Sequence, residues 1–302
     1  MKIKFLLTGV ISVFIFGTNA FSQNDGAAST GLAFLKFGAG ARSIAMGEAF
    51  SSVSDDATAF IYNPARLNKG NLNNIVFMHN QSVQDLNTDY VAAKFSISKK
   101  VSLGVGFFTS SINDIEIRNI PGAPIDKFDS RNLSTGISFG YSLNPELSLG
   151  LTGKFLYEKI YVDEASGLAF DFGVDYSKKN YSIAFVVLNL GSVNELKNQS
   201  TKLPASVRLG GSYNFSKDKF KFLLSLDGFK VLNGGKFHIH SGGEAGYKDF
   251  LFLRLGYQTD YDNKGFTTGI GFKYKSLSLD YAFVPYTNDF GTGNTISLGL
   301  NF

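Results

Sequence analysis

The histidines of this chain are its first candidates for metal chemistry. His238 and His240 are two residues apart and Glu244 follows at the same parity, so a strand would point all three to one face. Zinc requires three or four converging ligands, and the remaining histidine, His79, is far away in the sequence. The chain has no cysteine, which excludes disulfides, thiolate metal sites and thiol nucleophiles. We therefore expect no metal ion and no cofactor.

Three other short motifs resemble ligand-binding or catalytic sites only in part. Residues 260–265 are similar to the start of a calcium loop, but Lys264 and Gly271 stand where oxygen ligands are required. The Gly-Ala-Gly-Ala run at 38–41 lacks both a third glycine and the Lys-Ser/Thr pair of a phosphate-binding loop. The adjacent carboxylates at 55–56 have no recognisable nucleophile or base beside them. We expect no enzymatic activity.

The first residues have the pattern of a signal peptide. Lys2 and Lys4 precede an apolar stretch at 5–16 that is too short to span a membrane as a helix. Cleavage after Ala20 or after Ser22 would remove this segment, so we assign residues 1–22 to the signal peptide. Without its two lysines the formal charge falls from +4 to about +2, which does not indicate binding to nucleic acid.

Strict alternation of residue types dominates the chain from about residue 75 onward. In residues 133–141, Leu, Thr, Ile, Phe and Tyr occupy one face, and Ser and Gly occupy the other. The non-apolar face is rich in Gly, Ser, Thr and Asn rather than Lys and Glu, which favours the lumen of a membrane barrel over the outer face of a soluble sandwich. The same parity recurs at 101–107, 168–176, 205–215, 251–257, 268–274, 277–283 and 296–302.

The connections between these segments alternate in length. Short turns are expected near 98–100, 144–145, 178–180, 216–219, 248–249 and 275–276. The other connections are expected at about 110–132, 189–204, 229–236, 258–265 and 284–293, with a short turn at 162–166 as the exception. This asymmetry is typical of outer-membrane barrels. We predict an all-β fold, a transmembrane antiparallel barrel of about 14 strands over residues 73–302, with both termini in the periplasm.

Charged residues within the strands share the parity of the lumen face. The basic set is Lys94, Lys154, Arg208, Lys221, Arg254 and Lys273. The acidic set is Glu158, Asp171, Asp175, Asp227, Glu244 and Asp280. A basic side chain on the lipid face near the membrane midplane would cost about 2–4 kcal/mol, so this segregation suits a barrel. The balance of signs favours structural ion pairs over an ion-selective pore.

Residues 23–72 break the alternation, and we predict that they plug the lumen. A short helix is expected within 40–53, a second turn begins at 55–57, and Asn63-Pro64 ends it. About fourteen strands enclose space that such a segment would fill. We expect Arg208, Arg254, Asp171 and Asp280 of the wall to pair with Asp55, Asp56 or Arg42. The alternative is a docking peptide outside the barrel.

The last strand presents its apolar residues on one face and ends on an aromatic residue. These residues are Ile296, Leu298, Leu300 and Phe302. We predict that Phe302 is the assembly signal read by the barrel-assembly machinery, which inserts the chain among outer-membrane lipids.

Several motifs together resemble a known family. In the N-terminal segment they are Phe34-Leu35, Gly38-Ala-Gly-Ala-Arg42, Met46-Gly47, Ala49, Asp55-Asp56-Ala57 and Asn63-Pro64-Ala65. In the rest of the chain they are Leu188-Asn-Leu-Gly191, Leu203-Pro204 with Arg208-Leu-Gly210, Leu253-Arg-Leu-Gly-Tyr257, Leu279-Asp-Tyr281 and Ile296-Ser-Leu298. This ordered set resembles the PorV/PorQ family and, more distantly, the FadL fatty-acid channels. The resemblance implies a FadL-like barrel in the outer membrane of a Gram-negative, Bacteroidetes-type bacterium. It marks Gly38, Gly40, Arg42, Asp55, Asp56, Asn63 and Pro64 as the plug motif. Glu48 and Arg66 depart from it, because this family usually has glycine at both places.

The resemblance implies a non-enzymatic, partner-binding role in type IX protein secretion, with translocon components and secreted cargo as partners. The long connections at 110–132 and 189–204 would then contact those partners, and the isoleucines between Ile112 and Ile120 either contribute or extend the hairpin. A FadL-like channel for hydrophobic or small solutes is the alternative function, and a purely structural barrel is a third.

Overall fold

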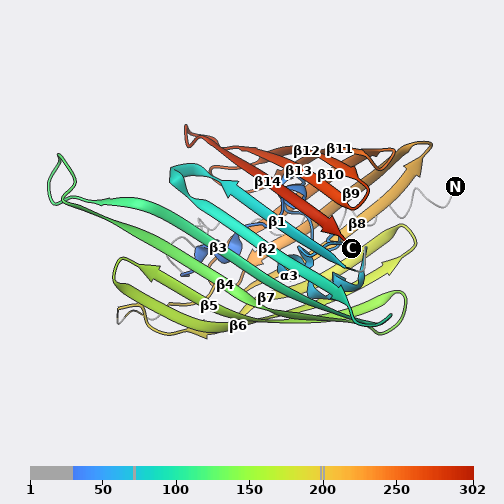
Figure 1. The fold of residues 1–302 in the computed structure, drawn as a ribbon, viewed down its shortest axis with the longest axis horizontal. Coiled ribbons are helices and arrows are strands. Elements are labelled where there is room, and N and C mark those ends of the chain that lie inside the picture. The colour runs from blue at the N-terminus through green and yellow to red at the C-terminus, as the bar shows by residue number, and fades with distance from the viewer. Residues whose placement is uncertain (1–29, 71–72, 198, 200) are drawn as a thin grey trace, which may run out of the picture.

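The fold is a closed antiparallel β-barrel. The computed structural model describes residues 30–70, 73–197, 199 and 201–302, so the predicted signal peptide lies outside the described residues. In the described chain fourteen strands each pair with their sequence neighbours, and β1 pairs with β14 to close the barrel (Figure 1). The predicted fold class, a barrel of about fourteen strands with a short helical N-terminal segment, is confirmed.

The strands differ in length around the barrel, so its wall is taller on one side. The strands are β1 Asn74–Gln81, β2 Asn87–Ser96, β3 Val101–Ile117, β4 Asp126–Ser142, β5 Leu147–Ile160, β6 Asp163–Lys178, β7 Tyr181–Val193, β8 Ser206–Lys217, β9 Phe220–Val231, β10 Phe237–Tyr247, β11 Leu251–Gln258, β12 Phe266–Tyr274, β13 Leu277–Pro285 and β14 Thr292–Asn301. The longest, β3 and β4, project well beyond the rest of the barrel (Figure 1).

Each strand buries one face and exposes the other, as the alternation predicts. In β4, Ile137 and Phe139 are exposed, while Ser134 and Ser138 are buried toward the lumen. Apolar residues face outward, which is stable only where lipid covers them. No helix among the described residues is long and apolar enough to cross a membrane.

The two ends of the barrel differ, and we call them the short-turn end and the long-loop end. The short-turn end carries the connections 97–100, 143–146, 179–180, 218–219, 248–250 and 275–276. The long-loop end carries 82–86, 118–125, 161–162, 194–205, 232–236, 259–265 and 286–291. The long connection predicted at 110–132 is wrong in extent. Strands β3 and β4 continue their pairing to the Ile117–Asp126 pair, past a bulge between Ile112 and Ile115, and leave 118–125 as the loop.

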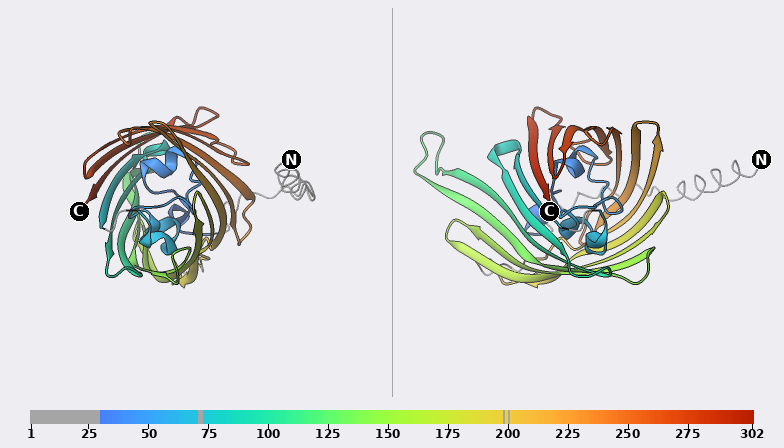
Figure 2. Two further views of the ribbon diagram at one scale, coloured as in Figure 1. Left: turned by 90° about the vertical axis from the view of Figure 1, so that its right-hand side faces the viewer. Right: turned by 45° about the vertical axis from the view of Figure 1, so that its right-hand side comes forward.

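The N-terminal segment lies inside the barrel (Figure 2). Its elements are η2 Ala33–Lys36, α2 Ala41–Ala45, α3 Ala59–Tyr62 and η3 Pro64–Asn68. We call described residues 30–70 the plug, and its position contradicts the alternative of a docking peptide outside. The helix expected within 40–53 is only five residues long. Gly47 and Glu48 have φ values of +63° and +59°, a left-handed conformation that ends the helix.

The plug packs tightly on the wall because the wall is lined by glycine where the two backbones meet. A Cβ on Gly150 would lie 2.2 Å from the backbone nitrogen of Ala65. A Cβ on Gly256 would lie 2.0 Å from the backbone nitrogen of Gly47. Any side chain at either position would therefore displace the plug.

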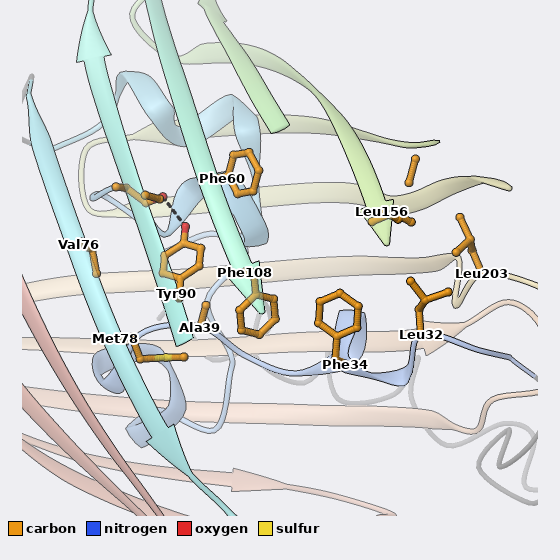
Figure 3. Packing of buried hydrophobic residues seen from close by; sticks show 13 residues of the cluster. Leu32, Phe34, Ala39, Phe60, Val76, Met78, Tyr90, Phe108, Leu156 and Leu203 are labelled. Atoms are coloured by element: carbon orange, nitrogen blue, oxygen red, sulfur yellow. Dashed lines mark hydrogen bonds between the residues drawn. The ribbon is translucent and has the colours of Figure 1, made fainter. Parts of the chain in front are cut away.

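Apolar packing holds the plug against the β1–β5 side of the lumen (Figure 3). Phe34 of the plug packs on Phe108 of β3 with ring centroids 5.6 Å apart, and Tyr90 of β2 meets Phe108 edge-on. Phe60 is 1% exposed within the same cluster. The Tyr90 hydroxyl donates a hydrogen bond of 2.9 Å to the backbone oxygen of Ala57, which satisfies it inside the core.

Candidate functional site

Five charged side chains form a continuous network between the plug and strands β10–β13. Arg42 of the plug donates to Asp55 at 2.7 Å and to both carboxylate oxygens of Glu244, at 2.8 and 2.9 Å. Arg254 donates to the same Glu244 at 2.6 Å and to Asp280 at 2.7 Å. Each guanidinium thus binds two carboxylates, which is the arrangement that stabilises buried charge. Glu244 fixes Arg42 to the wall.

Arg208 of β8 forms a second connection to the plug. It donates to the backbone oxygen of Glu48 at 3.0 Å and lies 3.7 Å from the Glu48 carboxylate and 3.9 Å from Asp227. Its guanidinium also stacks over the Phe229 ring, 4.3 Å from the centroid. Asp227 accepts the backbone N–H groups of plug residues 50 and 51, at 3.2 and 3.0 Å. One buried ion pair therefore binds the plug through both its members.

A third connection lies toward the short-turn end. Arg66 donates to Asp175 at 2.5 Å and to the backbone oxygen of Ser54 at 2.8 Å, and Lys69 lies 3.4 Å from the same Asp175. Lys94 of β2 donates to the backbone oxygen of Asp55 at 2.7 Å. These contacts attach the last part of the plug to the wall just before β1 begins.

Some of the expected plug–wall pairings are wrong. Arg254 of β11 and Asp280 of β13 pair with each other on the wall, and Asp171 pairs with Lys154 at 2.8 Å. Within the plug, Asp55 pairs with Arg42, and Asp56 accepts hydrogen bonds from Thr58. Parity assigned these charges to the lumen, but it does not give the height at which each one meets the plug.

Sequence reasoning missed Glu48 and Arg66 as plug–wall contacts. Both are departures from the glycine that the resembling family usually carries, and both bind charged wall residues. Glu48 has a left-handed backbone conformation, which is the physical reason for glycine at that place. The sequence did contain a signal for these contacts. Glu48 and Arg66 are charged residues in a segment of small residues, and the lumen wall offers charges of both signs to pair with them.

The plug motif residues act through backbone geometry and local hydrogen bonds. Asn63 accepts from the backbone N–H of Ala65 at 3.0 Å and donates to the backbone oxygen of Ser51 at 3.0 Å, while Pro64 begins η3. Gly38 lies against the Tyr62 hydroxyl, which itself donates to Ser43. Gly40, with φ +92°, starts α2.

The cavities beside the plug are small, except at the short-turn end. There a polar cavity of about 320 Å³ is bounded by Arg42, Asp55, Glu244 and Asp280. Lys273 also lines it and makes no ion pair among the described residues, while Lys221 pairs with Asp249 at 2.7 Å on the exposed rim. A cavity between the plug and β3–β9, lined in part by Phe108, is only about 30 Å³. Glu158 is buried toward the long-loop end.

The histidine pair faces the lumen, as its parity predicts, and contacts an aromatic loop residue. His238 stacks on Tyr261 with ring centroids 3.9 Å apart, and His240 Nε2 lies 3.0 Å from the Tyr261 hydroxyl. Both carboxylate oxygens of Glu244 face arginines instead. In the part of the chain that the structure describes, no group of three or more His, Cys, Asp or Glu residues is placed to hold a metal ion.

The long-loop end exposes apolar side chains beyond the membrane-spanning part of the wall. Ile120 is 76% exposed and Ile125 is 64% exposed at the tip of the β3–β4 hairpin, and Val162 in the next hairpin is 69% exposed. Phe128 and Tyr161 pack together at 5.6 Å and join the two hairpins. We call Ile120, Ile125 and Val162 the hairpin patch. Exposed apolar side chains at the ends of two hairpins suit contact with a partner.

Fold and site together define a plugged outer-membrane β-barrel. The family model of the type IX secretion system membrane protein PorP/SprF matches residues 57–301, and the chain belongs to that family. The match covers nearly the whole barrel and the last third of the plug. The motifs that resemble PorV/PorQ lie both before residue 57 and within the matched range, and the match itself shows the PorP/SprF family. No curated protein matches the chain.

Solved structures with the same fold are monoaromatic hydrocarbon channels and a FadL homologue. The CymD monoaromatic hydrocarbon channel superposes with a TM-score of 0.65 at 14% identity, covering 88% of this chain and 98% of that one. The Pseudomonas putida toluene transporter TodX gives 0.61 at 15%, with 88% and 98% covered. A Pseudomonas aeruginosa FadL homologue gives 0.54 at 13%, with 87% and 97% covered. At these identities the likeness establishes the FadL-like barrel fold.

Proposed function

We propose that this protein is a non-enzymatic accessory barrel of type IX secretion that binds partner proteins at its long-loop end. The observation that carries the proposal is the family match over residues 57–301. The filled lumen supports it, because the cavity of about 30 Å³ beside Phe108 is too small for a solute path. A binding role needs an exposed surface, and the hairpin patch supplies one.

The finer part of the proposal concerns partners and orientation. The PorV/PorQ-like motif in the plug supports a role in receiving the C-terminal domains of secreted cargo beside the translocon. The proposal places the short-turn end in the periplasm of a Bacteroidetes-type cell, following the usual asymmetry of outer-membrane barrels. The hairpin patch then lies outside the cell, where translocated cargo emerges.

Crosslinking in native membranes tests the partner-binding role. The intact protein should co-purify with type IX translocon components or cargo, identified by mass spectrometry. Replacing Ile120, Ile125 and Val162 together by serine should reduce that recovery severalfold, since exposed apolar contacts dominate such interfaces. Ile97→Ser is the matched control, because Ile97 is 61% exposed but lies at the short-turn end. Recovery of no type IX component with the intact protein would contradict the role.

A channel for hydrophobic solutes is the second candidate, favoured by the fold shared with TodX and CymD. It requires the plug to move, because the aromatic cluster of Phe34, Phe60 and Phe108 fills the lumen beside β3. Uptake of a small aromatic hydrocarbon into vesicles that contain the intact protein tests this candidate. Uptake no faster than into empty vesicles would reject it.

A further inference from the structure

One loop of the long-loop end reaches inward and contacts the plug directly. It is the β11–β12 connection, residues 259–265. Its Lys264 lies 3.4 Å from the Glu48 carboxylate of the plug, and the same ammonium lies over the Tyr261 ring, 4.5 Å from the centroid. A loop that served only to join two strands would not need a charged contact with a buried plug residue.

The same loop is also anchored to the wall through β10. The backbone oxygen of Thr259 accepts a hydrogen bond from His238 Nδ1 at 2.9 Å, and the Thr259 hydroxyl accepts one from the backbone N–H of Ile239 at 3.0 Å. The Tyr261 ring stacks on the His238 ring with centroids 3.9 Å apart and an angle of 13° between the ring planes. The Tyr261 hydroxyl lies 3.0 Å from His240 Nε2. The loop is thus held at one end by the wall and contacts the plug at the other.

The wall also binds Glu48, the plug residue that the β11–β12 loop contacts. The backbone oxygen of Glu48 accepts from Arg208 at 3.0 Å, and the backbone oxygen of neighbouring Gly47 accepts from Gln258 at 2.9 Å. Residues 47 and 48 both have left-handed backbone conformations, so this is a sharp bend in the plug clamped from two sides. Release of the bend would free the segment between α2 and α3.

We propose that the β11–β12 loop is a strap that fastens the plug at the long-loop end, through Lys264 on Glu48 and Tyr261 on the histidine pair. Contacts that exist only when the plug is docked stabilise the docked state, and the population of the undocked plug falls accordingly. The strap is also joined to the next loop, since Thr287 donates its N–H to the backbone oxygen of Asn263 at 2.9 Å. A partner that lifts either loop would therefore loosen the plug. The strap goes beyond the partner-binding role and does not depend on it.

Cysteine labelling of the plug tests the strap without any partner. The chain has no native cysteine, so Ser52→Cys introduces a single thiol. Ser52 is 1% exposed and its hydroxyl makes no hydrogen bond among the described residues, so the thiol replaces it with little disturbance. Maleimide then reacts only when the plug undocks. The measurement is the labelling rate of folded barrel in lipid vesicles, with folding checked by migration of unheated samples on gels.

In this background Tyr261→Ala should speed labelling about tenfold, within the range of ordinary coupling energies. Tyr261→Phe, which removes only the hydroxyl, and Lys264→Gln should each give a smaller increase of about threefold. Asp262→Asn is the control, because its side chain lies in the same loop, is 80% exposed and among the described residues forms an ion pair only with Lys236, at 3.8 Å. Unchanged rates in the Tyr261 and Lys264 variants, or an equal increase in the Asp262 variant, would overturn the proposal.

Discussion

The two sides of the lumen hold the plug mainly by different chemistry, although Lys94 of β2 donates to the plug on one side and Leu223 of β9 packs on it on the other. Strands β1–β3 and β5 contribute apolar side chains such as Met78, Tyr90 and Phe108, which pack on the aromatic residues of the plug. Strands β8–β13 contribute charged groups, and Arg208, Asp227 and Glu244 contact the plug directly. We call these the apolar side and the charged side.

The two sides contribute differently: apolar packing stabilises the docked plug, and the ion pairs determine its position. Burying a Phe or Leu side chain contributes roughly 1.5–3 kcal/mol and tolerates small shifts, because the hydrophobic effect is not directional. Buried ion pairs contribute little net stability after desolvation, but removal of one partner is costly. The apolar side therefore supplies the free energy of docking, and the charged side fixes the depth and rotation of the plug.

The largest expected effect comes from the apolar side. Phe60→Ala should lower the free energy of unfolding by about 3–5 kcal/mol, because it leaves a cavity between plug and wall. Urea unfolding in lipid vesicles, followed by circular dichroism, measures it, since the chain has no tryptophan. Phe107→Ala is the control, because Phe107 is 44% exposed on the lipid face beside Phe108. Equal losses in the two variants would remove the distinction between plug-facing and lipid-facing aromatics.

A somewhat smaller effect is expected on the charged side. Glu244→Gln removes the carboxylate shared by Arg42 and Arg254, and should cost about 3 kcal/mol. Adding Arg42→Gln should restore part of this loss, since the plug then carries no uncompensated guanidinium at that place. The double-mutant cycle of unfolding free energies gives the coupling. Strict additivity of the two changes would show that the network does not connect plug and wall.

Arg66→Gln tests one of the two plug residues that depart from the PorV/PorQ-like motif. Arg66→Gln leaves Asp175 with Lys69 at 3.4 Å and the Ser177 hydroxyl at 2.6 Å, and should cost about 2 kcal/mol. Arg131→Gln, which breaks an exposed pair with Asp129 at 3.0 Å, should change the unfolding free energy by less than about 0.5 kcal/mol. If the exposed pair proves as important as the buried one, Arg66 is not a plug–wall contact.

The smallest expected change in stability concerns the end of the chain. Phe302 is 63% exposed and contacts Phe95 edge-on with ring centroids 6.3 Å apart, an aromatic pair of about 1 kcal/mol. Deleting Phe302 should nevertheless lower the amount of folded barrel in cells, because we expect it to be the assembly signal. Phe290→Ala, at the long-loop end, is the control. Equal amounts of folded protein in the deletion and the intact chain would reject that role.

The barrel was predictable because the period-two alternation identifies strands, and the Gly-, Ser- and Thr-rich face identifies a lumen. The pattern predicts that Ile137 and Phe139 face lipid and that Ser138 faces the lumen, and in the structure the first two are exposed and Ser138 is buried. The extent of the β3–β4 hairpin was not predictable, because pairing continues beyond the membrane over residues with many charges. Ile112 and Ile115 keep the strand pattern only across a bulge that shifts the register.

The contacts of the plug were predictable in kind but not in detail. Parity put Arg208 and Glu244 in the lumen, and balanced charge indicated pairing. Which plug residue each one meets depends on how the chain turns at residues 47–48, where a non-glycine residue adopts a left-handed conformation. Sequence pattern alone does not indicate that Glu48 accepts this conformation, because its cost is offset by Arg208 and Lys264 in three dimensions.

The central claim is that the plug closes the lumen in the resting protein, and single-barrel conductance in planar lipid bilayers tests it most directly. The intact protein should show little or no steady conductance. A variant that lacks residues 32–68 but still migrates as folded barrel should conduct at a clearly higher level, because fourteen strands then enclose open space. Equal conductance of the two folded proteins would contradict the account.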